Sequence, residues 1–422
     1  MRLVAPDILH LSSITGSPLL DRKGEKIGRV EDLVVRATGA AHPPVGGLVV
    51  RIGGRELFVP IELVWEIRPH QVQLQGQKLN LSRFERRAGE LLLARDLSAR
   101  HLINVVGARL IRANEIELAL VDETWQVVGV DPSSRGAIRR ILPRSWGNKI
   151  ASGGIVDWES IEPFVSHIPS ARMRIPYRKL AKLRPAQIAD LVEAASHEEG
   201  REIIEAVGLN SELEADVFEE LDEEHQVEFL DARTNEEAGR LLARMESDDA
   251  ADLLNDLAQE RRIPILEAMP APQQAKLRRL LNYNPETAGG LMSPDFLALN
   301  QERRVSESLE ALRMSAVADE ILMTIYELDG GDRLCGTVSI VRLLKANPSA
   351  KLRDIAEHDP VSISADADIH EIVRKMADFN LSNLPVVDDE LRIIGVITFD
   401  DVLEEMIPSG WRRDLGMTAL ED

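Results

Sequence analysis

The stretch NPETAGGLMSPD, residues 284–295, joins two segments of different periodicity. Before it, apolar residues recur at helical spacing, and after it strand-like runs alternate with helical ones. Its paired glycines and two prolines interrupt both patterns, as turn-forming residues do. We therefore interpret residues 284–295, called the connector below, as the junction between a helical domain and a mixed α/β repeat.

The segment at 175–288 consists of short helical units with a 12-residue period. Each unit begins with acidic or proline-containing residues, which favour helix N-termini, and continues with an apolar face. One short helix cannot bury its own apolar stripe, so the pattern predicts a superhelix of stacked short helices. The apolar landmarks of this period are Leu209, Leu221, Met245, Leu257, Met269 and Leu281, and Arg233 occupies the one place that breaks the pattern.

Residues 289–408 contain an internal repeat, with predicted halves at 289–346 and 352–408. The sequence from Gly336 to Arg342 aligns with that from Gly395 to Asp401 at a constant offset of 59 residues. A helix-like stretch and a strand precede each copy. This tandem order of strand, glycine, strand, Ser or Thr and helix resembles a pair of CBS domains. Residues 409–422 are predicted to form a tail.

The front of the chain reads as β-rich, in two small halves at 1–85 and 86–170. Two strands that meet at Gly53-Gly54 predict a hairpin. A later stretch, 155–161, echoes residues 58–64. The two halves resemble PRC-barrel domains, the first more closely than the second. The predicted fold class is therefore multidomain α+β: barrel-like halves, a helical superhelix and a C-terminal pair of CBS domains.

Charge divides the chain in the same way. Residues 1–170 carry a net charge of +3 and the remaining residues carry −24, which together give the net charge of −21. Phosphate contacts need clustered Lys and Arg, so we do not expect the acidic part to bind nucleic acid. Its charge favours cations or basic surfaces as partners.

Several function classes are excluded or disfavoured by what the sequence lacks. Cys335 is the single cysteine, so neither an intrachain disulfide nor a Cys-cluster zinc site can form. No apolar run approaches the ~20 residues of a membrane-spanning helix, which predicts a cytoplasmic protein without membrane insertion. The histidines are scattered and no phosphate-binding loop occurs, so we expect no catalytic activity.

The connector and the acidic helical repeat together resemble the cytosolic region of MgtE-type magnesium channels. The run Ala288-Gly289-Gly290-Leu291-Met292 followed by Ser293-Pro294 carries the likeness, and residues 245–254 form a second matching patch. The resemblance covers about 180–408, whereas the barrel-like front is not typical of that family. In the family a membrane pore follows the second CBS repeat. No such segment follows here before residue 422, so the resemblance implies sensing and not conduction.

The resemblance also implies that Mg²⁺ closes the helical domain on the CBS pair by neutralising facing carboxylates. Asp249, Asp252 and Asp256 have the spacing i, i+3, i+7 and share one helix face. A hard divalent cation relieves the repulsion between such groups. The alternative is a solvated acidic face whose first residues cap a helix. On the CBS pair the facing carboxylates would be those of Asp400 and Asp401, and Asp368 and Glu371 are reserve candidates for the same role. The candidate ligands are Asp248, Asp249, Asp252, Asp256, Asp400 and Asp401.

A second candidate site follows from the pattern Gly395, Thr398 and Asp401, which binds adenosine nucleotides such as ATP in CBS pairs. The glycine lets the backbone approach a ligand, and the hydroxyl and carboxylate can bond ribose or phosphate. The alternative is that Thr398 caps the following helix. The first repeat has Ser339 and Arg342 at the equivalent places, so we expect one nucleotide site at most.

Our hypothesis from the sequence is a cytoplasmic regulator that responds to Mg²⁺, with adenine nucleotide as a second input. A homodimer through the CBS pair and a separate divalent-cation transporter are the partners that the resemblance implies. Two alternatives stay open: an interaction scaffold without ligand sensing, and an RNA- or ribosome-associated adaptor that uses the barrel-like front. The front's near-neutral charge argues against direct RNA contact.

Overall fold

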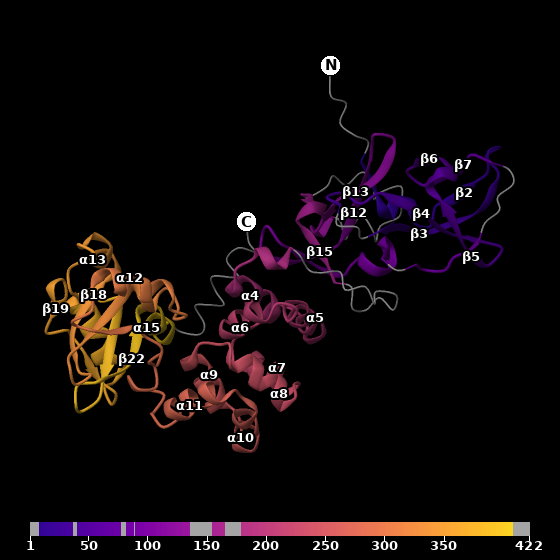
Figure 1. Ribbon diagram of the computed structural model, residues 1–422. Helices are drawn as coiled ribbons and strands as arrows, with labels where there is room; N and C mark the ends of the chain where they lie inside the picture. Colours follow the sequence, from indigo (N-terminus) through magenta and orange to yellow (C-terminus); the bar gives the residue numbers. More distant parts are fainter. Residues whose placement is uncertain are drawn as a thin grey trace. The chain divides into compact units, whose positions relative to one another are not determined.

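A computed structural model describes residues 8–36, 40–76, 82–87, 89–135, 154–164 and 179–407. The chain divides into two compact units, Met1–Leu213 and Glu214–Asp422, which we describe separately (Figure 1). The first unit is β-rich, and the second combines helices with the CBS pair, so the predicted α+β class is confirmed. The predicted tail at 409–422 lies outside the described residues.

The main sheet of the first unit has the strand order β6-β7-β2-β3-β4-β5-β8, with β9 pairing with β3. The predicted hairpin is confirmed, because β4 and β5 pair antiparallel across Gly53-Gly54. Both glycines have positive φ, as a tight two-residue turn requires. The strands are β2 (Pro18–Leu20), β3 (Lys26–Arg36), β4 (Val45–Ile52), β5 (Arg55–Pro60), β6 (Val64–Arg68), β7 (Gln71–Leu74), β8 (Ser82–Arg83) and β9 (Glu90–Leu92).

Two smaller sheets complete the β-rich part, and they interlock with the main sheet. Strand β1 pairs with β12 of a later sheet, whereas β9 pairs with β3 of the earlier one. One apolar core contains Leu9, Leu48 and Val127 together, so the two predicted halves share strands and a core. The smaller sheets are β1 (Ile8–His10), β12 (Glu115–Val121), β13 (Thr124–Asp131) and β14 (Val156–Asp157), and β11 (Arg109–Arg112), β10 (His101–Asn104) and β15 (Ile161–Pro163).

Short helices connect these strands and explain the echo between residues 58–64 and 155–161. In each copy a strand is followed by a single 3₁₀ turn and another strand: β5–η1–β6 and β14–η3–β15. The first unit ends with α4, which contacts β11, and with α5. The elements are α1 (Leu11–Ile14), η1 (Ile61–Leu63), η2 (Leu93–Leu97), η3 (Trp158–Ser160), η4 (Leu180–Lys182), α4 (Pro185–Ala194) and α5 (His197–Val207).

The helical period predicted from the sequence is confirmed. Successive helices from α6 to α11 begin 12 residues apart, and α6 contains the division between the two units. Arg233, which breaks the pattern, lies 4.7 Å over the Phe218 ring and donates to Glu214 Oε1 at 2.7 Å. The helices are α6 (Ser211–Glu219), α7 (Glu223–Asp231), α8 (Asn235–Leu242), α9 (Ser247–Asp256), α10 (Gln259–Ala268) and α11 (Ala271–Leu280).

The internal repeat appears as two sheets with matching strands. Strands β17 and β21, and likewise β18 and β22, begin 59 residues apart, as the sequence alignment predicts. The first sheet has the order β16-β17-β18-β19 and the second β20-β21-β22. The strands are β16 (Ala298–Asn300), β17 (Thr324–Leu328), β18 (Leu334–Ser339), β19 (Glu357–His358), β20 (Ile363–Ser364), β21 (Asn383–Val387) and β22 (Ile393–Thr398); the helices are α12 (Val305–Arg313), η5 (Ile321–Met323), α13 (Ile340–Lys345), η6 (Leu352–Asp354), α14 (Ile369–Phe379) and α15 (Phe399–Met406).

The connector is fastened to the second CBS repeat. The amides of Ala288 and Gly289 each donate to carbonyls that precede α14, both at 2.8 Å. Ser293 and Val396 then exchange two backbone hydrogen bonds of 2.8 and 2.9 Å, which adds the connector to the edge of β22. A Cβ on Gly290 would lie 2.5 Å from Asn284 O, so the second glycine is required for this turn.

Candidate functional site

Helix α9 carries the four predicted aspartates, and the helix gives them different environments. Asp248 is buried, with 7% of its surface exposed, and Asp249 is half-buried. Asp252 and Asp256 follow along the exposed side of the helix. The buried side of α9 is formed by alanine and leucine side chains that pack into the superhelix, which fixes the direction of the aspartates.

The first turn of α9 faces carboxylates from α15, as the sequence predicts. Desolvation is the main reason that the pKa of Asp248 is raised well above its usual range, and the nearby Asp401 charge raises it further. Asp401 also acts on Asp249 and Glu246, and Asp400 on Glu246. The structure therefore brings the two predicted sets of carboxylates together within the second unit.

Three further carboxylates belong to this cluster, and our sequence interpretation did not select them. Glu219 and Glu320 both raise the pKa of Glu246. Glu246 N donates to Glu219 Oε1 at 2.6 Å, so these two residues, 27 positions apart, are in contact. Glu246 lies in the acidic start of the unit after Met245, which is the signal that could have identified it. We call Glu219, Glu246, Asp248, Asp249, Glu320, Asp400 and Asp401 the acidic contact.

The surroundings of the acidic contact favour the neutral form of several of its carboxyl groups, Asp248 and Asp249 among them. Burial, followed by repulsion between the carboxylates, raises the pKa of Asp249 to about 9 and that of Glu246 to about 8. Burial also raises the pKa of Glu219 to about 7. Carboxylates in such surroundings bind either a proton or a cation near neutral pH, because full ionisation without a partner is unfavourable.

Asp256 lies outside the acidic contact, whereas Asp252 lies at its border, because its charge also raises the pKa of Asp248. Desolvation, then the charges of Asp256 and Glu405, raise the pKa of Asp252 to about 6. Desolvation also raises the pKa of Asp256, and the charge of Glu223 raises it further. The predicted i, i+3, i+7 face therefore exists, but Asp252 on this face lies near the end of α15, and Asp256 lies near the start of α7.

The arrangement is an extended acidic surface and not a compact chelate. Among the described residues, no three His, Cys, Asp or Glu side chains are grouped so that they could hold one metal ion together. Mg²⁺ keeps several waters and commonly uses only one or two carboxylates, which suits hydrated ions between facing acids. The six aspartates stay predictions as metal ligands.

The reserve candidates have local roles in helix α14. The Asp368 side chain accepts from Glu371 N at 2.9 Å and caps the helix. Glu371 forms an i, i+4 ion pair with Lys375 at 3.3 Å. Both carboxylates are therefore used in stabilising their own helix.

The predicted nucleotide residues have structural roles in the described chain. Met292 of the connector occupies the space beside Gly395 that the sequence pattern assigned to a ligand. A Cβ on Gly395 would lie 2.5 Å from Met292 Sδ. Thr398 and Asp401 form a capping box: Thr398 N donates to Asp401 Oδ2 at 3.1 Å, and Asp401 N to Thr398 Oγ1 at 3.4 Å. The capping alternative considered for Thr398 is thus present, and nucleotide binding by these residues stays a prediction.

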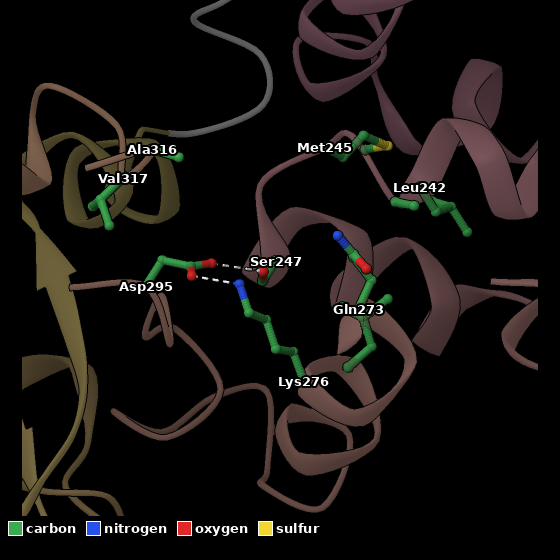
Figure 2. A pocket seen from close by; sticks show the side chains of 10 residues that line it. Leu242, Met245, Ser247, Gln273, Lys276, Asp295, Ala316 and Val317 are labelled. Atoms are coloured by element: carbon green, nitrogen blue, oxygen red, sulfur yellow. Dashed lines mark hydrogen bonds and ion pairs between the residues drawn. The ribbon is translucent and has the colours of Figure 1, made fainter. Parts of the chain in front are cut away.

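A cavity of about 260 Å³ lies beside the acidic contact, and Figure 2 shows its walls. In this view the Asp295 carboxylate points toward both Ser247 and Lys276. Asp295 Oδ1 accepts from Lys276 Nζ at 2.5 Å, and Oδ2 accepts from Ser247 Oγ at 3.1 Å. Residues of the helical domain and of the connector therefore meet here, and Ala316 and Val317 of the first CBS repeat complete the wall.

Comparisons with known proteins identify the second half of the chain. The MgtE intracellular N domain family matches residues 183–286, and the CBS domain family matches residues 352–408. The magnesium transporter MgtE of Thermus thermophilus is 33% identical over 193 residues, 45% of this chain and 43% of that protein. The Bacillus subtilis magnesium transporter MgtE is 26% identical over 192 residues, 46% of this chain and 43% of that protein. The chain thus spans less than half the length of these curated relatives.

Solved structures give the same assignment. The cytosolic domain of the Mg²⁺ channel MgtE in complex with ATP superposes with a TM-score of 0.51 and 29% identity, over 54% of this chain and 92% of that one. The soluble part of a magnesium transporter superposes with a TM-score of 0.50 over 54% of this chain and 90% of that one; its 21% identity supports the fold alone. Within the described ranges no helix is long and apolar enough to cross a membrane. The second half of the chain therefore contains an MgtE intracellular N domain followed by a CBS pair, homologous to the cytosolic domain of MgtE.

Proposed function

We propose that this chain is a cytoplasmic regulatory protein that responds to Mg²⁺ through closure of its helical domain on its CBS pair. The observation that carries the proposal is the acidic contact, in which α9 meets α15 through carboxylates whose pKa values are raised. A divalent cation that binds between these elements binds the closed state better than the open one. Mass action then shifts the population toward closure.

The regulated partner that fits this reading is a separate divalent-cation transporter. The support is homology to the cytosolic domains of magnesium transporters. The β-rich first unit is available to carry the response to such a partner. We further propose a homodimer through the CBS pair, supported by exposed apolar side chains on equivalent helices of the two repeats: Val341 and Leu344 on α13, and Phe399, Leu403 and Met406 on α15.

The test is small-angle scattering and thermal unfolding with titrated MgCl₂, each compared with NaCl of matched ionic strength. We expect millimolar Mg²⁺ to lower the radius of gyration and raise the unfolding temperature. The double variant Asp249→Ala/Asp252→Ala should lose most of this response. The molecular mass from the same scattering data shows whether the chain is a dimer. A wild type that responds equally to Mg²⁺ and to matched NaCl contradicts sensing and supports the scaffold alternative.

Adenine nucleotide is the second input that we propose, because the MgtE cytosolic domain that superposes on this chain is in complex with ATP. Asp401→Asn keeps an oxygen for the Thr398 amide but removes the charge that a ribose would meet. We expect calorimetry in EDTA to show ATP binding that weakens about tenfold or more in this variant. Asp400→Asn, an exposed neighbour on the same turn, is the matched control. Equal affinity in wild type and Asp401→Asn would remove the assigned site.

A further inference from the structure

Asp295 is held firmly to the CBS pair although it lies at the end of the connector. Two residues earlier, Ser293 exchanges two backbone hydrogen bonds with Val396 on strand β22. Met292 packs into the space over Gly395, where a Cβ would lie 2.5 Å from its sulfur. Three residues later, strand β16 begins at Ala298 and pairs with β17. The position of the Asp295 carboxylate therefore reports the position of the CBS pair.

The two partners of Asp295 come from the helical domain. Lys276 lies on α11 and donates at 2.5 Å, and Ser247 begins α9 and donates at 3.1 Å. Helices α9 and α11 pack against each other, so both donors move with one body. Figure 2 shows the three side chains converging at the wall of the cavity. We call Ser247, Lys276 and Asp295 the latch.

The latch lies next to the carboxylates that oppose closure. Ser247 stands between Glu246 and Asp248, both members of the acidic contact. The ion pair between Lys276 and Asp295 joins the helical domain to the connector at this point without any divalent ion being bound. The Lys276 and Asp295 side chains keep 40% and 33% of their surface exposed, so this ion pair has moderate strength.

We propose that Lys276, as the built-in counter-charge of Asp295, holds the helical domain on the CBS pair in the absence of divalent cation. It sets how much Mg²⁺ is needed to complete closure. This inference deepens the proposed function, since it names the residue that tunes the Mg²⁺ response. In the Mg²⁺-free state, the ion pair holds the two domains together whether or not the chain senses Mg²⁺.

The experiment compares Lys276→Met, Asp295→Asn and the exchanged pair Lys276→Asp/Asp295→Lys in the full chain. Lys351→Met is the matched control, because it breaks a similar 2.5 Å pair, with Glu302, within the CBS pair and not between the two domains. In EDTA, we expect faster amide exchange at the start of α9 and a larger radius of gyration in Lys276→Met and in Asp295→Asn. We expect neither change in the exchanged pair or in the control. In the Mg²⁺ titration, we expect their midpoint to rise about two- to fivefold, with recovery in the exchanged pair.

The outcomes separate the latch from Mg²⁺ sensing. If Lys276→Met matches Lys351→Met in EDTA exchange and radius, the latch is overturned whether or not Mg²⁺ compacts the wild type. If the wild type ignores Mg²⁺ but the single variants open in EDTA, the latch holds and the sensing proposal fails. Circular dichroism of each variant confirms that the helices are folded, so that opening is not confused with unfolding.

Discussion

Replacing Asp248 and Asp249 together with asparagine is expected to close the second unit without Mg²⁺. Both side chains belong to the acidic contact, and both have pKa values raised first by burial and then by neighbouring carboxylates. Asparagine has nearly the same shape, removes the charge and supplies N–H donors to the carboxylates opposite. The substitution therefore imitates neutralisation by a bound cation while leaving the packing of α9 unchanged.

The expected effect of these two substitutions on the stability of the second unit is large. Removing a buried, unpaired charge is worth about 2 kcal/mol or more. For a unit of this size that corresponds to about 4–8 °C in unfolding temperature in EDTA. The further rise caused by Mg²⁺ should shrink in proportion, because the repulsion that Mg²⁺ relieves is already gone. Differential scanning calorimetry with and without MgCl₂ measures both quantities.

Asp256→Asn is the matched control for this prediction. It lies on the same helix, but it is exposed, and the like charge that raises its pKa is that of Glu223 on α7. We expect it to change the EDTA stability and the Mg²⁺ response only slightly. A double variant Asp248→Asn/Asp249→Asn that is less stable in EDTA than the wild type would show that repulsion in the acidic contact does not govern closure.

The helical repeat was predictable because its physics is local. Each short helix has an apolar stripe, and α7 and α8 also begin with the capping residues Asp222 and Thr234. A 12-residue period in the sequence therefore becomes a 12-residue period in helix starts. Arg233 broke the sequence pattern without breaking the structure. Its long side chain covers the Phe218 ring, and so supplies the packing that an apolar landmark supplies elsewhere.

Features that depend on contacts between distant segments were harder to predict. Spacing on one helix placed Asp249 and Asp252 on a common face, but it did not indicate that Glu219 and Glu320 approach the same turn. The glycine pattern at Gly395 suggested room for a ligand, whereas Met292 of the connector packs there. Likewise, no local signal indicated that strand β1 joins a sheet formed more than 100 residues later.

Mg²⁺ and protons are expected to compete for the acidic contact, which predicts a pH dependence of a definite sign. The pKa values of Asp249, Glu246 and Glu219, about 9, 8 and 7, all lie above the ordinary values of 3.8 for Asp and 4.5 for Glu. A group whose pKa is raised by closure stabilises the closed state fully at low pH and loses that stabilisation as pH rises through the raised pKa. In EDTA, the closed second unit should therefore weaken between about pH 5 and pH 9, by about 1.4 kcal/mol per pH unit for each proton released.

Mg²⁺ should consequently stabilise the chain little at pH 5 and strongly at pH 8.5, because at pH 5 protons already neutralise the carboxylates. Its binding should also release protons, which calorimetry detects as a dependence of the apparent heat on the ionisation enthalpy of the buffer. Asp248→Asn/Asp249→Asn should flatten both the pH slope in EDTA and the proton release. If Mg²⁺ stabilises the wild type equally at pH 5 and pH 8.5, the cation acts somewhere other than the acidic contact, since no site made of these carboxylates can bind a proton and Mg²⁺ independently.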